Sequence, residues 1–137
     1  MKKKFLLLLL LVAALLLLCS CGGKQEAVSI DYGESELYTT KDMDAAIQVI
    51  QETFATFDGC TLHSLTYGGD AACVENLESC QTLSKAGEIE QCIVFNSSFH
   101  SPKEGGGAWE ADTEYTWTWY LGRETTGRWV LLTYGYA

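Results

Sequence analysis

The apolar positions that follow residue 37 first recur at the spacing of an amphipathic helix. Thr39 and Asp42 form a capping-box pattern ahead of them, and Gly59 provides a stop. The stripe on one face of this predicted helix consists of Met43, Ile47, Ile50, Phe54 and Phe57. A helix this amphipathic needs a sheet to cover its apolar face, so we expect the stripe to be core.

Further along, β-favouring segments separated by turn residues predict a sheet. Four strands are expected at 60–67, 88–101, 114–123 and 128–136, with a short helix at 70–86 after the first of them. The third strand alternates strictly, and one of its faces carries Tyr115, Trp117, Trp119 and Leu121. The order predicts an α+β fold with a long N-terminal helix packed on a curved antiparallel sheet of about four strands.

The start of the chain has the pattern of a secretory signal. Three lysines at 2–4 precede an apolar run at 5–18, which is shorter than the roughly 20 residues that a membrane-spanning helix needs. An uncleaved anchor is therefore the weaker alternative. The junction Leu18-Cys19-Ser20-Cys21 resembles the lipobox of bacterial lipoproteins, which predicts cleavage before Cys21 and lipid attachment to that cysteine.

This junction divides the chain into three parts. We expect a signal peptide at 1–20, a lipid-anchored flexible tether at 21–37 and a single α+β domain at 38–137. The tether prediction is based on a polar, glycine-containing segment without sustained periodicity. The expected location is the extracytoplasmic face of the cell membrane, with the lipid on Cys21 as the membrane contact.

Charge restricts the class of partner. The chain has 9 basic and 18 acidic residues, and loss of the three lysines with the signal leaves 6 basic residues and a net charge of −12. Phosphates repel such a surface, so nucleic acid is not an expected partner. The same balance disfavours a basic patch for anionic lipid.

Cysteines in the expected domain number four, namely Cys60, Cys73, Cys80 and Cys92. Outside the cytoplasm an even set permits two disulfides in three possible pairings. If Cys73 and Cys80 share one helix, two turns separate them by about 10 Å, so each needs Cys60 or Cys92 as its partner. A zinc site of these cysteines is the alternative, but the set lacks a close C-x-x-C pair.

Residues for catalysis are sparse in this sequence. The two histidines, His63 and His100, stand in no recognised metal-ligand motif, so we expect neither a metal nor a cofactor. A serine-hydrolase elbow and a phosphate-binding glycine loop are also missing from the sequence. Three acids, Glu110, Asp112 and Glu114, flank the third strand and are expected to be solvated.

Aromatic residues near the C-terminus suggest a binding surface. We expect Trp117, Trp119 and Trp129 to pack on the helix as core. The opposite face of the sheet then carries Thr116 and Thr118 together with the expected binding residues Tyr120, Tyr134 and Tyr136. Such a flat amphipathic surface suits a sugar or a protein.

Three segments also resemble a known family. They are YTTKDMDAAIQVI at 38–50, GCTL at 59–62 and the ending WTWYLGRETTGRWVLLTYGY. They are similar to a family of small secreted or lipid-anchored proteins of Gram-positive bacteria that is assigned only to a domain of unknown function. The resemblance implies a fold of the cystatin-like and nuclear transport factor 2-like group, and no activity or catalytic residues. Cys73, Cys80 and Cys92 are not part of the family's pattern.

Taken with the composition, these features favour a non-catalytic binding or interaction module that takes an extracytoplasmic protein, peptide or glycan. The alternative is a small pocket enzyme of the nuclear transport factor 2-like kind that uses a buried Asp or Glu, whose pKa burial raises toward neutrality. A third possibility is a structural or assembly lipoprotein recognised at a sheet edge.

Overall fold

The computed structural model describes residues 26–85 and 87–136. The predicted signal peptide, the lipobox-like junction with Cys21 and the first part of the predicted tether lie outside the described residues. Among the helices within those two ranges, none combines the length and the apolar character that crossing a membrane requires.

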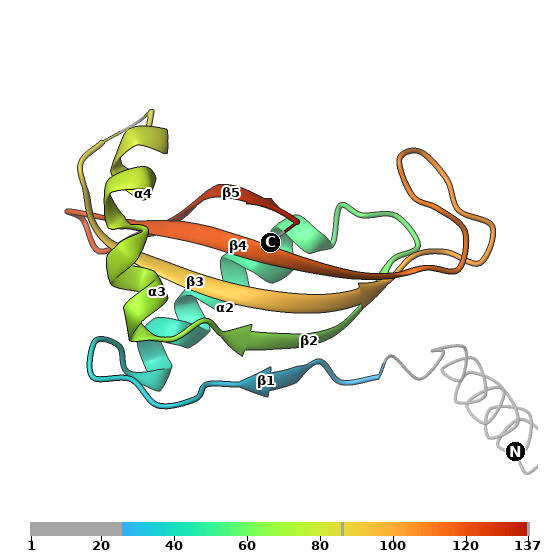
Figure 1. Cartoon of the computed structure of the whole chain (residues 1–137), viewed down its shortest axis with the longest axis horizontal. Coiled ribbons are helices and arrows are strands. Elements are labelled where there is room, and N and C mark those ends of the chain that lie inside the picture. The colour runs from blue at the N-terminus through green and yellow to red at the C-terminus, as the bar shows by residue number, and fades with distance from the viewer. Residues whose placement is uncertain (1–25, 86, 137) are drawn as a thin grey trace, which may run out of the picture.

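Five strands and three helices make up the described chain (Figure 1). In chain order they are β1 (Ser29–Asp31), α2 (Thr40–Phe54), β2 (Thr61–Tyr67), α3 (Asp70–Glu75), α4 (Leu77–Leu83), β3 (Ile89–His100), β4 (Glu114–Glu124) and β5 (Trp129–Gly135). The strands form one sheet in the order β1-β2-β3-β4-β5, in which β1 runs parallel to β2 and the other pairs are antiparallel.

The α+β class is confirmed, but the finer plan needs correction. The sheet is mixed and has five strands, and the helix of 15 residues follows a strand instead of opening the domain as a long N-terminal element. The additional strand, β1, lies in the segment predicted to be a flexible tether. Ser29–Asp31 is only three residues long, and three residues are too few for a hydrophobic period to reveal a strand in the sequence.

The segment after β1 is also bound to the domain. Asp70 accepts hydrogen bonds from Ser35 Oγ at 2.5 Å and from the Glu36 amide at 2.8 Å. Hydrogen bonding by Ser35, then by Glu36 and Tyr67, holds the pKa of the Asp70 carboxyl below its ordinary value. Residues 29–38 therefore belong to the folded domain, and the domain begins earlier than the expected residue 38.

Helix α2 begins as its sequence predicts. Thr39 Oγ1 accepts from the Asp42 amide at 3.2 Å, and the Asp42 carboxylate accepts from the Thr39 amide at 3.0 Å, which is a capping box. The Thr39 hydrogen bonds are the main reason that the pKa of Asp42 lies below its ordinary value. The predicted stripe is core along α2, where Met43, Ile47, Ile50 and Phe54 are buried together with Ala46. Its last residue, Phe57, lies beyond the end of the helix and is only partly buried.

Removal of this cap is expected to destabilise the domain. We expect Thr39→Ala to lower the free energy of unfolding by about 1 kcal/mol, because the Asp42 amide at the start of α2 loses the Thr39 hydroxyl as its acceptor. Thr40→Ala, one residue later and outside the capping box, is the matched control and is expected to change stability by less than about 0.5 kcal/mol. Urea unfolding followed by circular dichroism measures both values. Equal losses in the two variants contradict the capping role.

Helix α2 lies on one face of the sheet, and helices α3 and α4 cover one end of the other face (Figure 1). The predicted single helix is interrupted at Asn76, whose backbone leaves the helical conformation. A disulfide joins Cys80 of α4 to Cys92 of β3, whose Cα atoms are 6.2 Å apart. This bond anchors the helical segment on the longest strand of the sheet.

The expectation of two disulfides is wrong, since Cys60 and Cys73 are free thiols. Cys60 immediately precedes β2, whereas the Cys73 thiol lies 3.3 Å from the Tyr67 hydroxyl at the other end of that strand. Seven residues of strand span about 20 Å, far beyond the reach of a disulfide. Burial raises the pKa of the Cys73 thiol, which keeps it protonated.

Candidate functional site

Aromatic side chains gather on the α2 face of the sheet, at the end away from α3 and α4. Trp119 is fully buried there, and its indole Nε1 donates to Ser97 Oγ at 2.8 Å. Phe57, which follows α2, packs against Trp117 and Trp119 with ring centroids 5.7 and 6.1 Å apart. Trp109 from the loop between β3 and β4 lies 5.5 Å from the Phe57 ring. Three chain segments thus build one aromatic layer.

Two tyrosines extend this layer into solvent. Tyr134 is 41% exposed and stacks on Trp119 with centroids 4.8 Å apart, while Tyr136 is 75% exposed and lies 6.0 Å from the Trp117 ring. Both belong to the C-terminal end of the chain, where β5 forms one edge of the sheet. Phe57, Trp117, Tyr134 and Tyr136 are called the aromatic face below.

The structure divides the predicted binding residues between the two faces of the sheet. Tyr134 pairs with Trp119, and Tyr136 contacts Trp117, so both lie on the α2 face. Tyr120 pairs with Val94 and lies on the α3–α4 face. The prediction that all three tyrosines share one outer face is therefore wrong.

A β-bulge accounts for this difference. Trp129 and Leu131 pair with Arg123 and Leu121 on the α2 face, and simple alternation then sends Tyr134 to the other side. The register shifts opposite Tyr120 and Leu121, which inserts one extra residue into β5 and returns Tyr134 to the α2 face.

The tryptophans behave as core only in part. Trp119 and Trp129 are buried as expected, whereas Trp117 is partly exposed. The indole Nε1 atoms of Trp117 and Trp129 are buried without a hydrogen-bond partner. Trp117 therefore serves both the core and the aromatic face.

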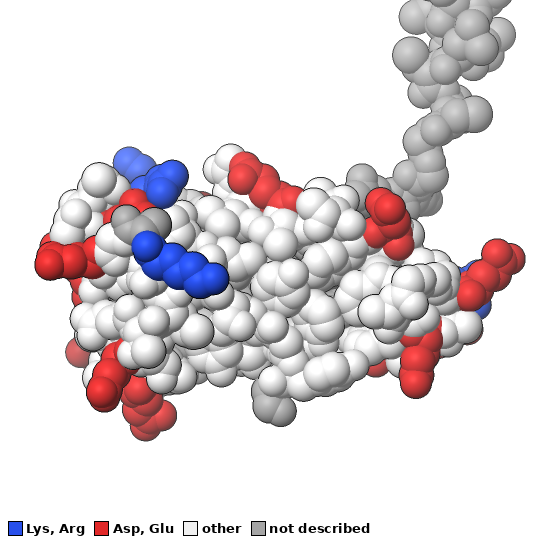
Figure 2. Space-filling model, turned by 90° about the horizontal axis from the view of Figure 1, so that it is seen from above, with Lys and Arg blue, Asp and Glu red and all other residues white. Residues whose placement is uncertain are grey.

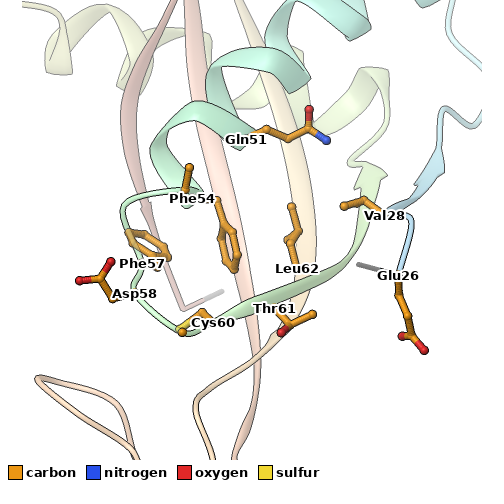
Figure 3. A pocket seen from close by; sticks show the side chains of 11 residues that line it. Glu26, Val28, Gln51, Phe54, Phe57, Asp58, Cys60, Thr61 and Leu62 are labelled. Carbon is orange, nitrogen blue, oxygen red and sulfur yellow. The ribbon is translucent and has the colours of Figure 1, made fainter. Parts of the chain in front are cut away.

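A hollow adjoins this layer at the end of α2 (Figure 3). It has a volume of about 700 Å³, and Phe54, Phe57 and Leu62 provide its apolar wall. Glu26 and Asp58 lie at its exposed rim, and the Cys60 thiol faces it. Phe57 lines the hollow and its ring also packs against Trp117 and Tyr134, so one side chain contributes to both surfaces.

The hollow lacks an activated catalytic group. Burial, followed by the charge of Asp58, raises the pKa of the Cys60 thiol, which disfavours the nucleophilic thiolate. Buried polar or charged side chains in the described part of the chain are Ser97, Ser101 and Thr118, none of which is an acid. This arrangement suits contact with a ligand better than proton transfer.

Charges lie mainly around the margin of the side of the molecule that carries β5. Figure 2 looks onto that side and shows a broad uncharged area, with acidic side chains near its edges and a few basic side chains (blue) at its left. An uncharged ligand that covers the middle of this surface therefore removes water from few ionised side chains, so the desolvation cost of binding is small.

The remaining acids and histidines lie elsewhere. Asp112 and Glu114 contact His100, whereas the backbone of Glu110 is bound by Ser101 and Tyr115. The proximity of His63 and His100 is not visible in the sequence, because it depends on the pairing of β2 with β3.

The comparisons add no assignment to this geometry. Searches with the chain against protein-family models, curated proteins and solved structures each found no match.

Proposed function

We propose that the protein is a non-catalytic binding module on the extracytoplasmic side of a membrane, attached by lipid on Cys21, and that its aromatic face binds a glycan. The observation that carries the binding role is the exposure of Tyr134 and Tyr136 on a base of tryptophan. A tyrosine ring offers an apolar plane and a hydroxyl, which match the faces and the hydroxyl groups of a sugar ring.

Preorganisation supports this choice of ligand. Tyr134 contacts Phe57, Trp117 and Trp119, with centroid distances from 4.8 to 5.8 Å, so little conformational freedom remains to be lost on binding. The adjacent hollow lengthens the surface along the sheet toward Cys60.

An enzyme of the nuclear transport factor 2-like kind has less support. That alternative needs a buried Asp or Glu, and all acids within residues 26–85 and 87–136 lie outside the buried set. Relationship to the Gram-positive family and to the cystatin-like group is part of the proposal, supported by the three sequence segments and by an α+β fold with α2 across the sheet.

The proposal predicts the effect of removing single rings. Titration of the full chain in detergent with a soluble hexamer of N-acetylglucosamine is expected to change tryptophan fluorescence, because Trp117 and Trp119 underlie Tyr134. We expect Tyr134→Ala and Tyr136→Ala each to weaken binding about 5- to 30-fold, the effect of losing 1–2 kcal/mol at a central contact.

Tyr120→Ala is the matched control, since Tyr120 lies on the other face of the sheet. Its affinity is expected to equal that of the unmodified protein. No binding of the hexamer, or equal losses from all three variants, overturns the glycan proposal. If the glycan proposal fails but the protein captures an extended peptide, the binding site is the open edge of β5.

A further inference from the structure

Two imidazoles and two carboxylates meet on the sheet face that carries α3 and α4, at the opposite end from those helices. His100 Nδ1 lies 2.8 Å from Glu114 Oε2, and His100 Nε2 lies 2.9 Å from Asp112 Oδ1. His63 Nε2 lies 3.5 Å from the same Glu114 oxygen. One ligand atom from each of His63, His100 and Glu114 falls within 4.8 Å of the others.

Strand register assembles this cluster. His100 of β3 pairs with Glu114 of β4 on one side and with Thr61 of β2 on the other. A β-bulge between Leu62 and Ser64 makes His63 the extra residue of β2. Bulges turn a side chain away from simple alternation, and here the His63 ring lies 6.2 Å from the His100 ring.

We propose that His63, His100 and Glu114 form a binding site for a zinc ion, with Asp112 as the residue that orients His100. The proposal is independent of glycan binding, which uses the other face of the sheet. Two histidines and a glutamate are a known ligand set for zinc with an open fourth position. Tetrahedral bonds of about 2.0–2.1 Å place ligand atoms about 3.3 Å apart, close to the separations of 2.8 and 3.5 Å found here.

Asp112 provides the outer contact that such sites require. A zinc-bound imidazole commonly donates its second N–H to a carboxylate, which selects the tautomer and orients the ring. Asp112 Oδ1 occupies this position against His100 Nε2 at 2.9 Å, leaving Nδ1 directed at Glu114. Asp112 has a positive φ of 50°, a left-handed backbone conformation that Asp adopts more readily than most other non-glycine residues.

The site is open to an ion from solution. His63 and His100 are partly exposed and Glu114 is exposed, so water can fill the fourth position. The carboxylates of Asp112 and Glu114 lie 2.9 and 2.8 Å from the ring nitrogens of His100, so negative charge that attracts a cation is concentrated at the cluster. The net charge of −9 adds attraction for a cation over longer distances.

Calorimetric titration with zinc chloride tests the proposal. The full chain is used in detergent without an affinity tag, and its accessible thiols are blocked with iodoacetamide so that cysteines cannot bind the ion. We expect one zinc per chain, and at least 100-fold weaker binding in His63→Ala and in His100→Ala. Asp112→Asn is expected to weaken binding about 10- to 100-fold, the usual effect of removing an outer partner.

Glu110→Gln is the matched control, because this nearby acid has no side-chain contact with the cluster and is expected to bind zinc as the unmodified protein does. Substitution of cobalt should give the visible absorption of a tetrahedral ion, and this absorption should be lost in His63→Ala. Circular dichroism establishes that the variants are folded. Absence of stoichiometric binding, or binding that survives both histidine substitutions, overturns the proposal.

Discussion

A Trp119→Ala protein is expected to lose about 3–5 kcal/mol of unfolding free energy, the largest effect of any substitution proposed for this chain. Trp119 is fully buried and stacks on Tyr134, and its indole donates to Ser97. Truncation leaves a cavity, removes the stacking contact and deprives the Ser97 hydroxyl of a partner.

Urea unfolding measured by circular dichroism gives this value. Tyr136→Ala is the control, because a ring that is 75% exposed contributes little to the core and should change stability by less than about 1 kcal/mol. A second variant, Trp119→Phe combined with Ser97→Ala, keeps a ring and removes both hydrogen-bonding groups, so it should recover a large part of the loss. A Trp119→Ala loss below about 1 kcal/mol is incompatible with Trp119 as the centre of the core.

Removal of the disulfide by Cys80→Ala with Cys92→Ala is expected to cost about 3 kcal/mol. The bond joins residues with a sequence separation of 12. Closing a loop of about this size lowers the conformational entropy of the unfolded chain, which stabilises the folded state by about 3 kcal/mol. Loss of the bond also frees α4, which packs on β3 and β4, from its covalent anchor. The helical segment should then exchange its amide hydrogens faster than the sheet does.

Cys60→Ala is the matched control, since Cys60 is a free thiol. Reductant should shift the unfolding midpoint of Cys60→Ala as much as it shifts that of the unmodified protein. It should leave the midpoint of the double variant unchanged. Peptide mapping after alkylation of the unfolded, unreduced chain should label Cys60 and Cys73 but leave Cys80 and Cys92 unlabelled. Labelling of all four cysteines contradicts the assigned bond.

Local patterns were sufficient wherever neighbouring residues carry the information. The capping box at Thr39 and the apolar stripe of α2 were predicted because a helix brings residues three and four apart onto one face. The four longer strands were predicted from β-favouring residues between turn residues, and strict alternation marked the strand at 114–123. Strand β1 was missed because its three residues contain no repeat.

The candidate sites required information that is not local. Alternation along β5 places Tyr134 beside Tyr120, but one extra residue in the bulge moves Tyr134 onto the same face as Trp119. Aromatic composition thus indicated a surface, and only strand register decided which rings compose it.

By itself, the sequence determined the α+β class, the start of α2, the burial of Trp119 and Trp129, and the acidic charge. Tertiary structure alone decided which cysteines bond, which face carries Tyr134, and that His63 meets His100 and Glu114. The reason is physical: periodicity reports what one segment buries, while pairing between distant strands depends on register, which a single bulge changes for every residue beyond it.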